Sequence, residues 1–306
     1  MDGVMVFKRW TLDGGLDLDG HKDLSRQRLI ISATIPDELV YPLVFRSGEV
    51  ARALVKTGDR VLKGQVIAES QGAQGTLLHA ASSGYIQENE LRTIAHPSGL
   101  KSLCLIIATD GLDEACSVAE PVHYSQLLPV EIRAKIHQSG IVGLGGAGFP
   151  TAVKLKPESS CEVDTLVING AECEPYITCD DRLMQQYPEQ ILLGIQVLLR
   201  ALTIKKCVIG IEEDMPEAID SMQKEIDRQG IDYIQVNVVP ALYPAGGERQ
   251  LIYLLTGRET PSNGFPVDVG VICQNIGTVM AVYQSIFQGQ ALTERVVTLT
   301  GLGLKT

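Results

Sequence analysis

Ser-Gly-Ile-Val-Gly-Leu-Gly-Gly-Ala-Gly-Phe-Pro-Thr-Ala-Val-Lys (residues 139–154) contains five glycines within nine positions, 140–148. Glycine accepts positive φ and lets another group approach the backbone closely. Such a loop can present several N–H groups to one anion, most often a phosphate, and Lys154 adds a positive charge. A short apolar run then ends at Asn169, and polar groups just beyond a buried strand mark the ligand-binding edge of an open α/β sheet. The two pieces predict a nucleotide or flavin site.

Residues 143–148 also fit the letters of the dinucleotide fingerprint G-x-G-x-x-G, which requires a strand before it and a helix after it. The preceding stretch, 129–138, instead carries Ile132 and Ile136 four positions apart, with charged residues between them. This is a helical period, which disfavours an ordinary Rossmann fingerprint. A P-loop is disfavoured further, because no Gly-Lys-Ser/Thr follows. A glycine-rich connector without a ligand stays open as the alternative.

After residue 160, apolar strand-like runs alternate with helical patterns. We expect strands at 165–169, 207–211, 234–239 and 269–273, and helices at 181–202, 248–256 and 277–287, with a further helix that Asp214 caps. A β-like segment starts at 296–299. Alternating strands and helices predict a parallel sheet covered on both faces, with the carboxyl ends of its strands along one edge.

Residues 39–110 show a different pattern, of short apolar pieces joined by glycine turns, and predict a small all-β unit. Val-Lys-Thr-Gly-Asp-Arg-Val-Leu-Lys-Gly-Gln-Val (55–66), followed by His-Ala-Ala-Ser-Ser-Gly (79–84), resembles the barrel-sandwich hybrid of biotinyl and lipoyl carriers. Those carriers present a modifiable lysine in a hairpin between their two halves. The corresponding hairpin here, 69–75, has no lysine. We therefore expect a docking or scaffolding module.

Several ungapped motifs are far more specific than the glycine spacing. They are Ala-His-Pro-Ser-Gly-Leu (95–100), Gly-Leu-Gly-Gly-Ala-Gly-Phe-Pro-Thr (143–151), Asn-Gly-Ala-Glu-Cys-Glu-Pro (169–175), Asp-Asp-Arg-Leu-Met (180–184), Tyr-Pro-Ala-Gly-Gly-Glu-Arg-Gln-Leu (243–251) and Cys-Gln-Asn-Ile-Gly-Thr (273–278). Together they resemble the RnfC family of the Rnf electron-transport complex. More distantly, they are similar to the NADH-binding flavoprotein of respiratory complex I.

The resemblance implies an α/β fold, in which a Rossmann-like parallel sheet forms an FMN/NADH-binding domain and an all-β barrel-sandwich hybrid precedes it. We expect an irregular segment at 1–35 that wraps another domain, the sandwich hybrid at 36–115, and the Rossmann-like domain at 121–292. Residues 293–306 would begin a further, truncated β-rich domain.

The resemblance also implies one non-covalent FMN, with NADH as the substrate that stacks on its ring. The matching positions for FMN are Gly143, Gly145, Gly146, Lys154, Asn169, Glu172, Tyr243, Gly246, Gly247, Gln274, Asn275 and Thr278; those on the NADH side are Phe149, Glu174 and Glu248. Two positions depart from the complex I pattern, since Ala171 and Gly247 stand where that family has acids. Both departures fit RnfC.

Chemistry gives some of these residues a role independently of the resemblance. The carboxylates Glu172, Glu174 and Glu248 can accept hydrogen bonds from ribose hydroxyls or a carboxamide, and we expect Arg182 and Arg249 to keep them ionised. The N–H groups of the helix that opens at 277 would be available to a phosphate. Hydride transfer needs no protein acid or base, so no catalytic residue is predicted.

Composition excludes several classes of protein. The net charge of −11 over 306 residues argues against a general nucleic-acid binder. No apolar run is long enough to cross a bilayer, and the first residues lack the apolar core of a signal peptide. The seven cysteines are scattered without a C-x₂-C pair, so we expect reduced thiols and no metal site or iron–sulfur cluster in this chain.

These observations predict a flavoprotein that takes a hydride from NADH onto FMN. The resemblance implies that electrons then pass to 4Fe-4S clusters in a C-terminal ferredoxin-like region that this chain lacks. The implied partners are the membrane and ferredoxin-like subunits of the Rnf complex, and the implied location is peripheral, on the cytoplasmic side of the bacterial inner membrane. A non-catalytic docking or scaffold module and a related cobalamin-reducing flavoprotein are the alternatives.

Overall fold

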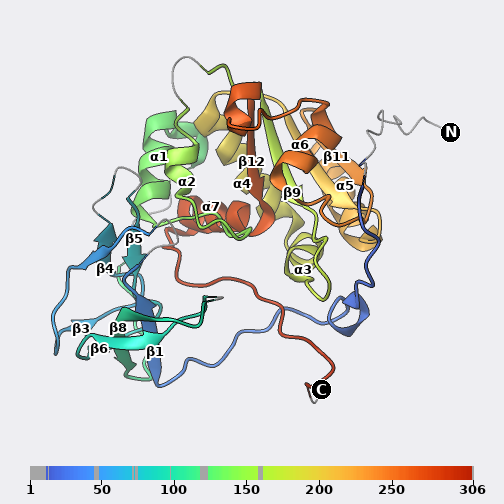
Figure 1. Ribbon diagram of the computed structural model, residues 1–306. Helices are drawn as coiled ribbons and strands as arrows, with labels where there is room; N and C mark the ends of the chain where they lie inside the picture. Colours follow the sequence, from blue (N-terminus) through green and yellow to red (C-terminus); the bar gives the residue numbers. More distant parts are fainter. Residues whose placement is uncertain are drawn as a thin grey trace. The chain divides into compact units, whose positions relative to one another are not determined.

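The computed structural model of the chain describes residues 12, 14–44, 48–70, 72, 75–96, 98–117, 123–157 and 161–304. Its internal contacts divide the chain into two compact units (Figure 1). The sheet unit comprises residues 1–30, 157–280 and 296–306, and the sandwich unit comprises residues 31–156 and 281–295.

The sandwich unit is built on two antiparallel sheets, as the short apolar pieces and glycine turns predict. One has the order β1-β8-β6-β3, with β7 also paired to β8, and the other has the order β2-β4-β5. The strands are β1 (Glu38–Pro42), β2 (Ala51–Ala53), β3 (Arg60–Val61), β4 (Val66–Ser70), β5 (Leu77–His79), β6 (Gly84–Ile86), β7 (Glu90–Thr93) and β8 (Lys101–Thr109).

The core of the sandwich unit is filled from both sheets. Leu105 and Ile107 of β8 lie in it together with Ile67 of β4, and all three side chains are buried. Leu39 and Tyr41 of β1 are partly buried against the same cluster. Alternate residues of each strand therefore supply the core, which is the period-two pattern of a two-layer β unit.

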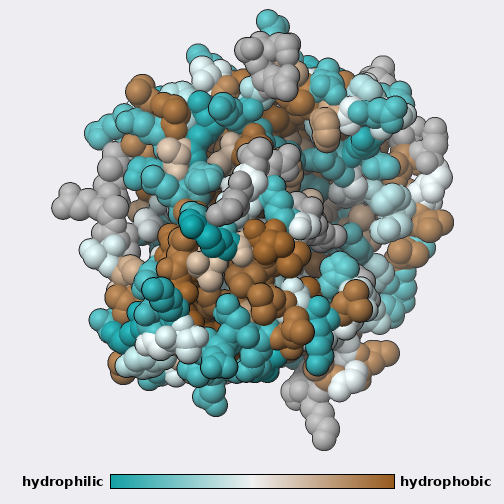
Figure 2. Space-filling model, turned by 60° about the vertical axis from the view of Figure 1, so that its left-hand side comes forward, coloured by the Kyte–Doolittle hydropathy of each residue, from teal (hydrophilic) through white to brown (hydrophobic). Residues whose placement is uncertain are grey.

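Part of the predicted carrier-like hairpin lies outside the described residues, namely 71, 73 and 74. Several large apolar side chains of the sandwich unit are exposed, among them Val40, Leu91 and Leu103. Exposed apolar side chains appear as brown areas in Figure 2.

The sandwich unit also contains the helical elements that flank the glycine-rich segment. A 3-10 turn, η2 (Tyr124–Gln126), precedes α1 (Pro129–Gln138), and the short α2 (Thr151–Lys154) follows the glycines. A helix thus leads into the glycine loop, as predicted, and the loop is not the strand–loop–helix of a Rossmann fingerprint.

The sheet unit contains four parallel strands in the order β11-β10-β9-β12. They are β9 (Thr165–Gly170), β10 (Cys207–Glu212), β11 (Ile234–Val239) and β12 (Val271–Asn275). The chain builds outward from β9 through β10 to β11 and then returns to pair β12 with the other side of β9. The strand order therefore reverses between β9 and β12, which makes this place the topological switch point.

Helices cover both faces of this sheet. The connections are α3 (Cys179–Gln186), α4 (Pro188–Leu202), α5 (Pro216–Gln229), α6 (Glu248–Thr256), the 3-10 turn η3 (Pro266–Val269) and α7 (Ile276–Gln288). Leu251 and Ile252 of α6 pack with Val167 and Cys273 of the sheet in one buried cluster. On the other face, Gly170 of β9 lies against Met184 of α3. The predicted α/β class, with a parallel sheet after an all-β unit, is confirmed.

Three local predictions were wrong. The single helix expected at 181–202 is two helices, because Pro188 cannot donate an N–H and displaces Tyr187 from helical dihedrals. Met215 precedes the first turn of α5 where Asp214 was expected, and Asp214 instead pairs with Arg26. Residues 296–299 form no strand, and the described stretch 289–304 contains neither helix nor strand.

Two further features concern the ends of the described chain. The N-terminal part is irregular except for the 3-10 turn η1 (Lys22–Leu24). Among the described residues, no helix is both long and apolar enough to span a bilayer.

A close approach of two helices gives a test of the sheet unit. A Cβ added at Gly194 of α4 would lie 2.5 Å from the carbonyl oxygen of Val279 and 2.8 Å from its Cγ1. Because backbone cannot move aside cheaply, we expect Gly194→Ala to lower the free energy of unfolding by about 1–3 kcal/mol in urea denaturation. Gly303→Ala is the control, since no atom lies within 4 Å of its added Cβ. Unchanged stability of Gly194→Ala would contradict this packing.

Candidate functional site

The carboxyl ends of β9 and β12 bring two of the predicted site residues together. Asn275, the last residue of β12, is the register partner of Asn169 in β9. Both lie at the switch point, where the connections leave the strands in opposite directions and open α/β sheets bind their ligands.

Asn169 joins two loops at this edge. Its side-chain Oδ1 accepts a hydrogen bond from the backbone N–H of Ala171 at 3.1 Å, and its Nδ2 donates to the carbonyl oxygen of Gly246 at 2.8 Å. A Cβ at Gly246 would lie 3.2 Å from Cys173 Sγ and 3.3 Å from Ala171 Cβ. The loop after β9 and the loop before α6 are therefore in close contact, and glycine at 246 keeps that contact free of strain.

Asn275 plays the corresponding part at the start of α7. Its Oδ1 accepts from the N–H of Gly277 at 2.9 Å and from the N–H of Thr278 at 3.4 Å, and its Nδ2 donates to Asp180 Oδ2 at 2.5 Å. The N–H groups that we expected to face a phosphate are thus capped by Asn275. A phosphate at this helix end would have to displace the Asn275 carbonyl group.

Gln274 stands out among the predicted residues because its amide is buried without a partner. The side chain is 4% exposed, and its Nε2 has no hydrogen-bond partner among the described residues. An unpaired buried donor costs about 1–3 kcal/mol. A ligand with an acceptor at this point would recover that cost.

Glu172 supports α3 from the loop after β9. Its Oε1 accepts from the N–H of Asp180 at 2.9 Å and from the Cys179 thiol at 3.3 Å, and its Oε2 accepts from the N–H of Asp181 at 3.0 Å. Burial raises the pKa of Glu172, while the two N–H groups and Lys22 oppose that rise. In the structure its carboxylate is committed to the first turn of α3, where the helix dipole favours a negative charge.

The remaining acids predicted to contact NADH are exposed. Glu174 lies in the loop after β9, and Glu248 is the first residue of α6. The cations next to the buried acids are not those that we expected. Arg249 donates to the carbonyl oxygens of Pro261, Ser262 and Gly264, and Arg182 donates to the carbonyl oxygen of Arg26 and to Gln185.

The charge beside Glu172 comes instead from the N-terminal strap, residues 16–26, which sequence reasoning missed. Lys22 Nζ donates to the carbonyl oxygen of Glu172 and lies 3.6 Å from Glu212 Oε2. The strap pairs with two of the loops at this edge: Leu16 exchanges two backbone hydrogen bonds of 2.8 Å with Tyr243, and Tyr176 N–H donates to Gly20 at 2.7 Å. An irregular segment carries no periodic signal, so its destination could not be inferred from pattern.

Glu212, the last residue of β10, is the most perturbed acid of this edge for which a value can be given. Burial raises its pKa to about 7, with Asp214 and the Glu172 charge adding to the rise and Lys22 and the Glu172 backbone N–H opposing it. Its Oε1 is buried without a partner among the described residues. The carboxyl therefore holds its proton to higher pH than an ordinary glutamic acid does.

Two cysteines lie near the site, and both are thiols. Burial raises the pKa of Cys173 to about 11 and also raises that of Cys179. A raised thiol pKa disfavours the thiolate that ligates metals or attacks disulfides.

The glycine-rich loop belongs to the sandwich unit. Gly143 N–H donates to the carbonyl oxygen of Phe149 at 2.8 Å, and Gly148 N–H donates to that of Gly143 at 3.1 Å. Gly146 has φ 112°, which an L side chain rarely adopts. The loop is therefore a closed turn that requires glycine. Gly145 is exposed, and Lys154 ends the short α2 that follows the loop.

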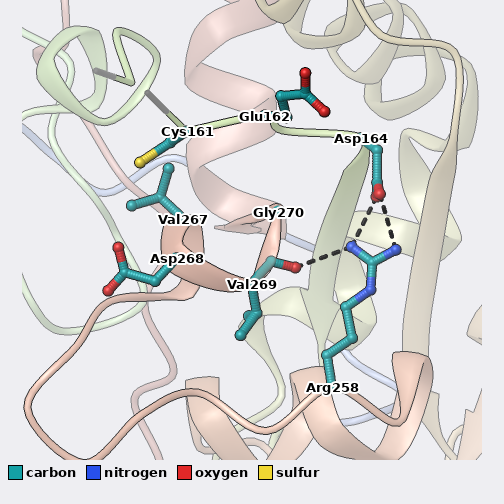
Figure 3. A pocket seen from close by; sticks show the side chains of 8 residues that line it. All are labelled: Cys161, Glu162, Asp164, Arg258, Val267, Asp268, Val269 and Gly270. Carbon is teal, nitrogen blue, oxygen red and sulfur yellow. Dashed lines mark hydrogen bonds and ion pairs between the residues drawn. The ribbon is translucent and has the colours of Figure 1, made fainter. Parts of the chain in front are cut away.

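A depression of about 650 Å³ lies at the opposite end of the sheet, where β9 and β12 begin. Figure 3 shows Arg258 directed at Asp164, with hydrogen bonds of 2.8 and 2.9 Å, and at the Val269 carbonyl oxygen at 2.9 Å. None of the predicted site residues lines it. Its arginine is already paired, and this depression is separate from the switch point.

Two family models match the chain. They are the RnfC barrel sandwich hybrid domain over residues 10–112 and the Nuo51 FMN-binding domain over residues 136–284.

Curated relatives match nearly the whole chain. It is 43% identical over 294 residues to the C component of the ion-translocating oxidoreductase complex of Vibrio cholerae serotype O1, covering 96% of this chain and 38% of that protein. The same component of Yersinia enterocolitica is 44% identical over 292 residues, covering 95% of this chain and 41% of the relative. The chain spans about two fifths of the length of these relatives.

Among solved structures, an NAD+-reducing nickel–iron hydrogenase in the air-oxidized state aligns at 25% identity with a TM-score of 0.45. The alignment covers 52% of this chain and 30% of that chain.

Replacing Glu212 tests the buried acid directly. The native carboxyl titrates at about 7, above its ordinary value of 4.5, so the native state binds an extra proton in this window and the free energy of unfolding falls as pH rises through it. We expect wild type to lose on the order of 3 kcal/mol more than Glu212→Gln across the window, in urea denaturation at a series of pH values. Exposed Glu213→Gln should keep the wild-type profile. Parallel profiles for wild type and Glu212→Gln would contradict the burial of this charge.

Proposed function

We propose that this chain, which carries the barrel sandwich hybrid and FMN-binding domains of the RnfC family, is the electron-entry part of an ion-translocating oxidoreductase complex. It would bind FMN non-covalently, accept a hydride from NADH, and pass electrons on to 4Fe-4S clusters held outside this chain. Its partners would be the membrane and ferredoxin-like subunits of an Rnf complex, at which it would sit peripherally on the cytoplasmic side of the inner membrane.

The observation that carries this proposal is the switch point of the parallel sheet. The FMN-binding domain match spans residues 136–284, and within it Asn169 and Asn275 face each other across β9 and β12, beside the unpaired amide of Gln274. Amide groups at the carboxyl edge of a parallel sheet suit a flat heterocycle with polar edges.

The donor and acceptor groups at this edge fit a flavin. Its ring carbonyls are acceptors, which the Gln274 Nε2 can satisfy. Its ribityl hydroxyls are donors, and the exposed carboxylate of Glu174 is an acceptor at the same edge. The acids leave little room for an unshielded phosphate. The predicted phosphate contacts, Lys154 and the glycine loop, remain predictions from the resemblance.

Bound FMN supplies a two-electron acceptor that can release its electrons one at a time. The part of this chain is to bind and orient the cofactor and the nicotinamide nucleotide. Glu174 and Glu248 are exposed acceptors for nucleotide hydroxyls or the carboxamide, and we retain Phe149, 37% exposed, as the predicted stacking residue. No side chain is required to act as an acid or base in hydride transfer.

The proposed activity can be measured on the chain itself. We expect the purified protein to quench the fluorescence of added FMN, and anaerobic NADH to bleach the flavin's visible absorbance. Binding without bleaching would contradict NADH as the donor. A folded protein that leaves the fluorescence of FMN unchanged would contradict the flavin site and favour a non-catalytic scaffold.

A substitution of Gln274 separates ligand binding from folding. Gln274→Leu removes the unpaired donor, so we expect stability to rise by about 1 kcal/mol while FMN affinity falls roughly threefold to tenfold, the loss of one hydrogen bond. Thr260→Val is the matched control, because Thr260 Oγ1 is also buried without a partner among the described residues but does not lie at the switch point. It should leave FMN affinity unchanged. Wild-type affinity in Gln274→Leu would refute the contact.

A further inference from the structure

The strap places a buried cation beneath the loop that follows β9. Lys22 is 6% exposed, although it lies in a three-residue 3-10 turn of an otherwise irregular segment. Burying an ammonium group is costly unless it is paired and hydrogen-bonded. Its two partners are the carbonyl oxygen of Glu172 and the carboxyl group of Glu212.

These two partners fix the same peptide segment from different directions. Lys22 holds the carbonyl oxygen of Glu172, and the Glu172 N–H lowers the pKa of Glu212 by hydrogen bonding to it. The Glu172 side chain is held in turn by the first turn of α3. Asn169 fixes the preceding residue, Ala171. Of the contacts that set the course of this loop, those of Lys22 come from a segment about 150 residues earlier in the chain.

The loop fixed in this way carries the groups that the proposed flavin site uses. Asn169 contacts both Ala171 and Gly246, so a displacement of the loop after β9 also moves the loop before α6. The exposed carboxylate of Glu174 is two residues beyond the carbonyl that Lys22 holds. The position of both loops therefore depends on the ammonium group of Lys22.

We propose that Lys22 is a positioning residue for the flavin site, holding the 171–174 loop in its binding geometry and compensating the carboxylate of Glu212. This inference rests on the proposed function. It assigns to the N-terminal strap a part in ligand binding, although Lys22 itself does not touch the flavin.

The charge and the hydrogen bond of Lys22 can be separated by substitution. Lys22→Met removes both, whereas Lys22→Gln keeps a donor for the Glu172 carbonyl and removes only the charge. The charged groups that face Glu212 in the described structure are Lys22, Glu172 and Asp214. Without Lys22, ionisation of Glu212 is uncompensated, so the loop is disturbed more as pH rises.

The test is FMN affinity as a function of pH, measured by fluorescence quenching on the full chain. We expect Lys22→Met to bind FMN about tenfold more weakly than wild type above pH 7, with the deficit growing as pH rises. The double variant Lys22→Met/Glu212→Gln should lose that pH dependence, and Lys22→Gln should bind between Lys22→Met and wild type. A merely structural role would lower stability without coupling FMN affinity to the state of Glu212.

Arg26→Met is the matched control from the same strap. Arg26 lies 3.6 Å from Asp181 and 3.4 Å from Asp214. We expect it to lower stability while leaving FMN affinity within about twofold of wild type, since no charge-assisted contact to the 171–174 loop is lost. Wild-type affinity of Lys22→Met at every pH, or an equal loss in Arg26→Met, would overturn the inference. Failure of the wild-type chain itself to bind FMN would instead overturn the proposed function.

Discussion

Parallel pairing of β9 with β12 is the constraint on which the rest of this structure depends. It places Asn275 opposite Asn169 at the carboxyl edge and reverses the strand order there. Because the connections then depart to either side, the edge is left to side chains and loops instead of to a crossover helix. Each asparagine caps the backbone that follows its strand, so the strand pairing also fixes the loop after β9 and the start of α7.

The second determinant is the charge at that edge. Acids concentrate there: Glu172 and Glu212 end or follow strands of the sheet, and Asp180 and Asp181 open α3. Buried carboxylates of like sign destabilise one another unless cations or N–H groups compensate them. The sheet unit provides both: the first turn of α3 donates two N–H groups, and the strap contributes Lys22. An anionic cofactor can use such an edge only if these charges are already compensated.

Local patterns predicted the fold because they are read within single elements. The strand at 234–239 and the helix at 248–256 have the predicted bounds, since a compact apolar run and a complete helical period define them. The break at Pro188 was missed because apolar spacing continues through it, although the proline itself was visible. Asn169, Gln274 and Asn275 could be predicted as edge residues from their place after apolar runs. Lys22 could not, because its role comes from a long-range contact of an irregular segment that has no period.

The measurement that tests the account most directly is an experimental structure of the chain with FMN bound. The account predicts the flavin beyond the carboxyl ends of β9 and β12, with Gln274 Nε2 within hydrogen-bond distance of it and Lys22 still on the Glu172 carbonyl oxygen. Flavin at the amino end of the strands, beside Arg258 and Asp164, would contradict it. So would flavin at the switch point with Gln274 still unpaired, because the amide that motivates the site would then have no part in it.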